Sequence, residues 1–156
     1  MKVNQPFDAN FLNLQDILIN NAVIENNAGF ASLENGKFYF DINYAFEPAI
    51  NIALNKIRII FVCNIETKTN NNKKIKIGGK FEISYIFEVE KLANFVMEVG
   101  EVIEIDNELA ISLANIAYTT TRGIIYAKCQ GTILQSLILP VTSTDALINV
   151  FLKQKT

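Results

Sequence analysis

The residue types that most often perform chemistry in proteins are scarce in this chain of 156 residues. It contains no histidine, which excludes Ser-His-Asp and Cys-His nucleophile systems and every histidine metal ligand. Its two cysteines, Cys63 and Cys129, are too few for a thiolate zinc site, and we expect both to be buried free thiols in a reducing cytosol. We therefore expect no enzymatic activity, no metal centre and no cofactor.

Three further groups have both a chemical and a structural interpretation. Gly78-Gly79-Lys80 resembles a fragment of a phosphate loop, but the Walker spacing is absent and the string lies inside a strand pattern, which favours a β-bulge. Glu82 and Glu88 alternate with apolar residues, so a solvated sheet face outweighs acid–base chemistry. Arg122 lies among apolar helical neighbours, where an ion pair or hydrogen bonds to a neighbouring carbonyl group are the simpler account.

Composition limits the class of partner. Half of the residues are hydrophobic and the net charge is −2, so there is no basic field for nucleic acid or a membrane surface. No apolar run reaches the length of a membrane span, and the first residues lack the apolar core of a secretory signal. We expect a single domain over residues 1–156 in the cytoplasm, with either a large core or apolar surface that meets a partner.

Four stretches in the first half alternate as strands do. They cover residues 15–27, 38–46, 56–67 and 75–89. Asn35-Gly36 predicts a hairpin turn, and Pro48 is expected to end the second strand. Residues 90–106 fit neither period, and we expect a short helix followed by an extended piece over residues 101–105.

A long helix is predicted from about Asn107 to just before Gly131, which can adopt a left-handed conformation. Its two apolar stripes predict that the helix is covered on both sides, because a monomer would leave one stripe in water. The first stripe comprises Leu109, Leu113, Ile116, Ala117, Thr120, Ile124 and Ala127, and the second comprises Ile111, Ala114, Tyr118, Ile125 and Cys129. An apolar connector broken by Pro140 follows, and Thr142 is expected to cap a short last helix.

These elements predict an α+β fold. A four-stranded antiparallel sheet is covered on one face by the long helix, and a short C-terminal helix follows. A helix of about 23 residues spans about 34 Å, and a strand of about ten residues spans about 33 Å. The helix therefore has the right length to cover one face of the sheet.

Several local strings in the last third of the chain, in the same order, resemble the SecB family of export chaperones. They are Tyr118 to Arg122 inside the long helix, Gly131-Thr132 at its end, Leu137 to Val141 in the connector, and Asp145-Ala146-Leu147 at the start of the last helix. The order of strands upstream supports the resemblance. It implies a tetramer built as a dimer of dimers with the long helices at the interface, for which we expect Ile111, Tyr118 and Ile125.

The resemblance and the missing catalytic groups together predict an ATP-independent holdase. Such a protein binds unfolded or extended polypeptide on apolar and aromatic surface, either for protein export or for one dedicated client, such as the antitoxin of a toxin–antitoxin pair. The residues expected to bind the client are Phe40, Tyr44, Phe61, Tyr85, Ile133, Leu134 and Leu137. The alternative is a small-molecule carrier or an enzyme that uses a cavity between sheet and helix, which would need convergent polar groups on the inward face.

In the SecB family the export motor SecA docks on an acidic patch and on the C-terminal tail. The resemblance places two of the acidic positions at Glu25 and Glu82, a third at Asn21, and an apolar docking position at Lys80. The residues after the last helix, 153–156, are basic where the family has a longer acidic tail. We therefore expect SecA to bind weakly.

Overall fold

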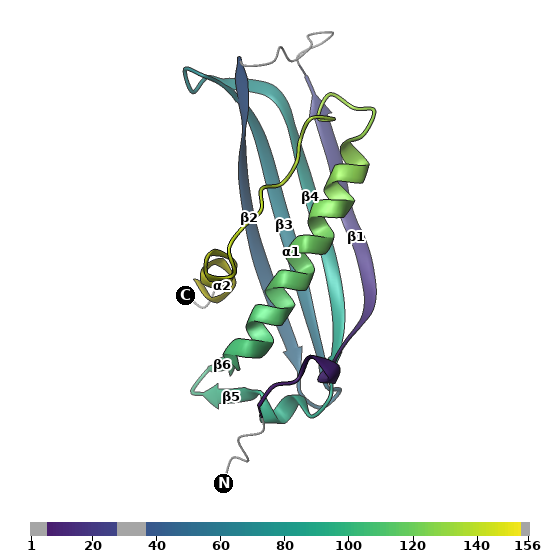
Figure 1. Cartoon of the computed structure of the whole chain (residues 1–156), viewed down its shortest axis with the longest axis vertical. Coiled ribbons are helices and arrows are strands. Elements are labelled where there is room, and N and C mark those ends of the chain that lie inside the picture. The colour runs from purple at the N-terminus through teal and green to yellow at the C-terminus, as the bar shows by residue number, and fades with distance from the viewer. Residues whose placement is uncertain (1–5, 28–36, 154–156) are drawn as a thin grey trace.

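A four-stranded antiparallel sheet forms the centre of the computed structural model, which describes residues 6–27 and 37–153. The strand order is β1-β4-β3-β2, and the long helix α1 lies diagonally across one face (Figure 1). The strands are β1 (Leu12–Asn26), β2 (Phe38–Asn51), β3 (Lys56–Thr69) and β4 (Lys74–Val89). The helices are α1 (Asn107–Cys129) and α2 (Thr144–Leu152), so the expected α+β architecture is confirmed. A single turn of 3₁₀-helix, Ala9–Phe11, precedes β1.

We expected the second strand to end at Pro48, but it continues to Asn51. Pro48 lies opposite Ile59 in the register of β2 and β3. Because β2 is an edge strand, one side of it pairs with no other strand of the sheet, and a missing N–H on that side costs no ladder hydrogen bond. The expected turn at Asn35-Gly36 lies outside the described residues.

The sheet face beneath α1 carries the alternating apolar side chains of all four strands. Cross-strand pairs such as Phe61 with Ile83 and Ile57 with Phe87 place these residues on one face. The alternating residues of β3 and β4 on this face are buried, as expected: Ile57, Ile59, Phe61, Cys63, Ile65, Phe81, Ile83, Tyr85, Phe87 and Val89. The opposite face, called here the outer face, carries the charged residues of the same strands.

A β-bulge in β4 confirms the structural interpretation of the glycine pair. The register with β3 shifts between Glu66, opposite Gly78, and Thr67, opposite Ile75. A Cβ atom on Gly78 would lie 2.5 Å from the carbonyl oxygen of Ile65, so glycine is required for the two backbones to approach this closely.

The segment from residue 90 to residue 106 holds more structure than expected. A turn of 3₁₀-helix, Leu92–Asn94, is followed by a hairpin of β5 (Val96–Val99) and β6 (Val102–Ile105). The extended piece over residues 101–105 is confirmed in β6, whereas β5 was missed because four residues are too few to show a period. Gly100, with φ of 64°, permits the tight turn between them.

Both helices begin at side-chain caps. Asp106 accepts hydrogen bonds from the backbone N–H groups of Glu108 and Leu109, and Gly131 follows the last turn of α1 with φ of 74°, as expected. The cap of α2 is Ser143, not Thr142 as expected. The Thr142 hydroxyl instead donates to the hydroxyl of Tyr118 over 3.0 Å. No helix within the described ranges is long and apolar enough to cross a membrane.

Candidate functional site

A row of large side chains follows β2 on the same face as α1. We call Phe38, Phe40, Ile42 and Tyr44 the aromatic row. All four are half-buried, whereas Phe46 beyond them is fully buried and lies 5.5 Å from the ring of Phe151 in α2. The helix α2 covers the lower part of β2 (Figure 1), so the aromatic row begins where this cover ends.

The connector between the helices, residues 130–143, crosses the sheet from the end of α1 to the start of α2 (Figure 1). Leu134, Leu137 and Leu139 are buried beneath it, whereas Ile138 is 61% and Val141 is 85% exposed. An extended segment can bury only one of its two faces. The other face of this connector therefore presents aliphatic side chains to solvent.

Two side chains of α1 hold the connector in place. The Arg122 Nε atom donates to the carbonyl oxygen of Leu139 over 2.9 Å, which confirms the hydrogen-bond interpretation of this arginine. The hydroxyl of Tyr118 donates to the carbonyl oxygen of Pro140 over 2.8 Å. Both bonds satisfy connector carbonyl groups that have no strand partner.

Tyr44 joins the aromatic row to the connector. Its ring lies 5.2 Å from that of Tyr118, whose hydroxyl accepts a hydrogen bond from Thr142 of the connector. Burial raises the pKa of Tyr44, and the neighbouring Tyr118 raises it further, against the lowering effect of the Thr142 hydroxyl. The phenol therefore stays neutral, and this part of the surface is uncharged.

Only part of the expected client-binding set faces solvent. Phe40, Tyr44 and Ile133 are half-buried and remain candidates. The expectation was wrong for Phe61, Tyr85, Leu134 and Leu137, which are fully buried in the core. Alternation in the sequence shows which residues share a face, but it does not show which part of that face a helix or connector covers. The sequence reasoning missed the half-buried residues Phe38 and Ile42, which the alternation along β2 already contained. It also missed Ile138 and Val141, which are exposed.

The expected oligomer interface also needs correction. Tyr118 and Ile125 are 2% and 0% exposed, because α1 turns both side chains toward its own sheet. Only Ile111 is half-buried. The two apolar stripes of α1 lie on either side of the line along which the helix comes closest to the sheet. The sheet of the same chain therefore buries much of both stripes.

Apolar surface is found instead on the edge strand β1. Leu18 and Ile19 are 48% and 44% exposed and point to opposite faces, and Ile17 and Val23 are exposed as well. On α1, Tyr126 is exposed, and Ile116 and Ile124 are half-buried.

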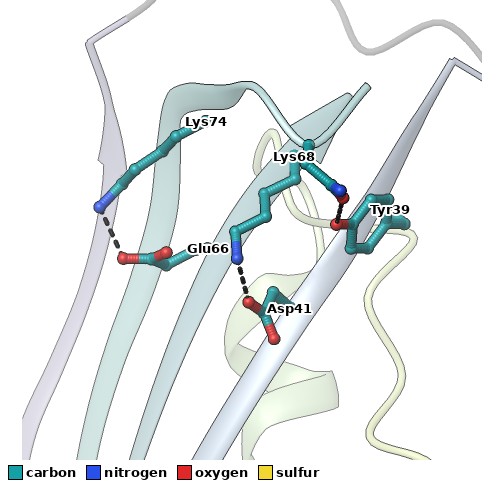
Figure 2. A network of polar contacts seen from close by, with 6 residues as sticks. Tyr39, Asp41, Glu66, Lys68 and Lys74 are labelled. Carbon is teal, nitrogen blue, oxygen red and sulfur yellow. Dashed lines mark hydrogen bonds and ion pairs between the residues drawn. The ribbon is translucent and has the colours of Figure 1, made fainter. Parts of the chain in front are cut away.

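The two carboxylates expected to dock SecA both lie on the outer face. Glu82 is opposite Asn21, Lys80 is opposite Val23, and Gly78 is opposite Glu25, so Lys80 lies in the row between the two acids. Glu82 accepts a hydrogen bond of 3.2 Å from Asn20. Further along the outer face, ion pairs join Lys68 with Asp41 and Lys74 with Glu66 (Figure 2).

The chemistry of the buried polar groups is limited to hydroxyls. Within the described residues the buried polar side chains are Thr67, Ser84 and Thr121, and no three His, Cys, Asp or Glu side chains gather as metal ligands would. The hydroxyls of Tyr85 and Thr121 lie 2.6 Å apart. Burial raises the pKa of Tyr85 to about 12, against the lowering effect of that bond, so the phenol carries no charge at neutral pH.

Comparisons with known proteins bear on the fold. No protein-family model matches the chain, and no curated protein matches its sequence. Among solved structures, a SecB-like chaperone of Mycobacterium tuberculosis, in complex with a ChAD peptide from the HigA1 antitoxin, matches with a TM-score of 0.60 and 14% identity, over 86% of this chain and 92% of the other. A Streptococcus agalactiae protein of unknown function matches with a TM-score of 0.41 and 13% identity, over 85% and 96%. The fold of this chain is that of a SecB-like chaperone.

Proposed function

We propose that this protein is an ATP-independent chaperone, a holdase that binds unfolded or extended polypeptide segments. The observation that carries the proposal is the half-buried aromatic row of β2 beside a connector whose Ile138 and Val141 face solvent, on a SecB-like fold. The complex of the M. tuberculosis SecB-like chaperone with an antitoxin peptide supports a peptide client. The buried thiols Cys63 and Cys129 suit a reducing cytoplasm.

Such a surface can bind many sequences. Apolar side chains of a client gain about 25 cal/mol for each Å² removed from water. The free edge of β2 offers backbone donors and acceptors to an extended segment, and these groups do not depend on the client's sequence. Neither contribution requires a nucleotide.

The client can be one of two kinds, an exported precursor or a dedicated partner such as an antitoxin. For export, Glu25 and Glu82 would dock SecA, but Lys80 lies between them and adds repulsion toward a basic partner. We therefore favour weak SecA binding and a dedicated client. Calorimetry against the cognate SecA tests this choice, and submicromolar affinity that is lost on Glu82→Ala would contradict it.

We further propose that the chain forms a homo-oligomer, in the SecB manner a tetramer. The support now comes from β1, whose unpaired edge carries exposed aliphatic residues on both faces. A long apolar edge strand without proline favours pairing with a second strand, and a twofold axis through β1 would satisfy both copies at once.

The carrier or enzyme alternative receives less support. It needs several polar groups that converge on a cavity between α1 and the sheet. The side chains of α1 that face β3 and β4 are apolar apart from the hydroxyls of Tyr118 and Thr121 and the Cys129 thiol, and Thr121 is already bonded to Tyr85. The apolar packing of α1 against β3 and β4 instead stabilises the sheet that carries the aromatic row.

The test of the holdase is suppression of aggregation of a chemically unfolded substrate. At near-stoichiometric concentration the protein should suppress light scattering equally with and without ATP. The double variant Phe40→Ser/Tyr44→Ser should lose most of this activity, whereas Tyr126→Ser, which removes an exposed aromatic ring from α1, should retain it. Circular dichroism checks that each variant is folded. Suppression that requires ATP, or none at all, would overturn the proposal.

A further inference from the structure

The hairpin of β5 and β6 lies at the end of the sheet where α1 begins, opposite the end where β2 starts (Figure 1). One face of the hairpin packs against the core through buried Val96 and through Ile103 and Ile105, which are half-buried. On its other face, Val99 lies opposite Val102 and Met97 lies opposite Glu104 in the register. We call these last four residues the hairpin face.

Aliphatic side chains dominate the hairpin face. Met97, Val99 and Val102 are 43%, 49% and 41% exposed. In the described part of the chain, no further strand pairs with β5 or β6. The core already holds the hairpin through its other face, so the stability of this chain does not account for three aliphatic side chains in solvent. Exposed apolar residues that lie side by side are typical of interaction surfaces.

The charged residues of the hairpin are all carboxylates. From residue 92 to residue 121 the chain has five acidic residues and neither lysine nor arginine. Two of the five serve the start of α1, as its cap and as an acid in its first turn. The other three, Glu98, Glu101 and Glu104, are exposed, and within the described residues none of them makes an ion pair or a side-chain hydrogen bond.

The cations at this end of the sheet lie elsewhere. Lys91, which precedes the hairpin, lies 5.6 Å from the centre of the Phe11 ring. Lys56 and Arg58 are on the outer face of β3, whereas the hairpin packs against the core on the α1 side. The negative charge of the hairpin is therefore not neutralised by a neighbouring side chain.

A hollow of about 250 Å³ borders the hairpin face, and both Met97 and Glu104 line it. Lysine and arginine have an aliphatic stem and a charged head. A wall that combines a thioether with a carboxylate suits such a side chain, because the stem contacts the first and the head pairs with the second.

We propose that the hairpin face docks a basic amphipathic segment of another polypeptide. Apolar side chains of the segment cover Val99 and Val102, and its lysine or arginine side chains pair with Glu101 and Glu104. The same carboxylates disfavour other occupants. Nucleic acid and anionic lipid would meet like charge, and a second copy on a twofold axis would set its carboxylates against these. The hairpin face contains no residue of the aromatic row, and the inference does not depend on the proposed chaperone activity.

Fluorescence anisotropy at low ionic strength tests this inference with two labelled peptides of equal length. One peptide combines leucine with lysine, and the other combines leucine with glutamate. The lysine peptide should bind the wild-type protein at least about tenfold more tightly, because charges at the rim set partner choice. Glu98→Gln/Glu101→Gln/Glu104→Gln should lower its affinity at least about fivefold. Val99→Thr/Val102→Thr keeps the β-branched shape that suits strands, and it should weaken binding without altering the preference.

The control is Asp16→Asn/Glu47→Gln/Asp145→Asn, which neutralises three exposed carboxylates on β1, β2 and α2. It changes the net charge equally and should leave the affinity for the lysine peptide within about twofold. Equal loss in both triple variants would show that only net charge matters and would overturn the inference. Loss of binding in Phe40→Ser/Tyr44→Ser would also overturn it, because the peptide would then occupy the aromatic row. A lower oligomer mass for Val99→Thr/Val102→Thr would assign the hairpin face to a second copy and would equally overturn it.

Discussion

The Nε atom of Arg122 in α1 lies 2.9 Å from the carbonyl oxygen of Leu139 in the connector. Four residues earlier on the same helix, the hydroxyl of Tyr118 lies 2.8 Å from the next carbonyl oxygen, that of Pro140. Residues four apart lie on one face of a helix, so a single face of α1 holds two consecutive connector carbonyls. These bonds set the path of the connector, and the path leaves Ile138 and Val141 exposed.

Replacing Arg122 with methionine should destabilise the protein by about 1–3 kcal/mol, because the carbonyl oxygen of buried Leu139 would lose its partner. Urea unfolding followed by circular dichroism measures this loss. Amide hydrogen exchange should rise in the connector while the strands remain protected. Lys128→Met, at an exposed position in the last turn of α1, is the matched control and should change stability by less than about 0.5 kcal/mol. Equal effects of the two substitutions would contradict the role of Arg122.

Two glycines should respond to alanine with opposite signs. Gly78→Ala should cost about 1–3 kcal/mol, because its Cβ atom would meet the Ile65 carbonyl oxygen at 2.5 Å and force the strands apart. Gly123→Ala, in the exposed middle of α1 with no atom within 4 Å of the new Cβ, should gain about 0.5–1 kcal/mol. Thermal and urea unfolding of both variants measure the two changes. A stabilised Gly78→Ala would show that the bulge relaxes freely.

The oligomer should depend on β1. Multi-angle light scattering at micromolar concentration should give a mass several times the 17.5 kDa of one chain. The double variant Leu18→Glu/Ile19→Glu should reduce this mass to that of smaller species, because it places a charge on each face of the edge strand. Leu54→Ser, which removes an exposed aliphatic side chain at another site, should leave the assembly intact.

The matched test inside the core is Ile125→Asp. It should unfold the protomer itself, because Ile125 is fully buried against its own sheet and the new carboxylate would have no partner there. A folded Ile125→Asp protein of reduced mass would instead show that this residue faces a partner chain. A monomeric wild-type protein would overturn the proposed oligomer.

Stability should fall at alkaline pH. Burial raises the pKa of the Cys63 thiol from 9.0 to about 12, and the nearby Cys129 adds to the shift. The folded state therefore retains a proton that the unfolded chain releases near pH 9. This contribution is fully present below pH 9 and is lost as the pH rises toward about 12, at about 1.4 kcal/mol per pH unit. Urea unfolding at pH 8, 9.5 and 10.5 should show a shallower decline for Cys63→Ala. Parallel profiles for the two proteins would contradict the assignment.

Much of this protein could be predicted from local residue patterns. The period of two in β3 and β4 identified the buried face residue by residue, since a strand must alternate its side chains. The start of α1 was predicted at about Asn107 and its end just before Gly131, because the signals at helix ends act over only a few residues. The lack of histidine excluded histidine-dependent nucleophile systems and histidine metal ligands from the sequence alone.

The sequence by itself determined the four long strands, the two helices, the apolar faces of β3 and β4 and the α+β class. Only the tertiary structure decided which of those apolar residues meet solvent. Phe40 and Phe61 have the same type and the same face of one sheet, yet Phe40 is half-buried and Phe61 is fully buried. The difference depends on where α1, α2 and the connector cross the sheet, which follows from long-range packing and from the bonds of Tyr118 and Arg122. The face of the sheet to which a side chain points is a local property of the backbone. Whether that side chain is buried depends on helices and a connector that are distant in sequence.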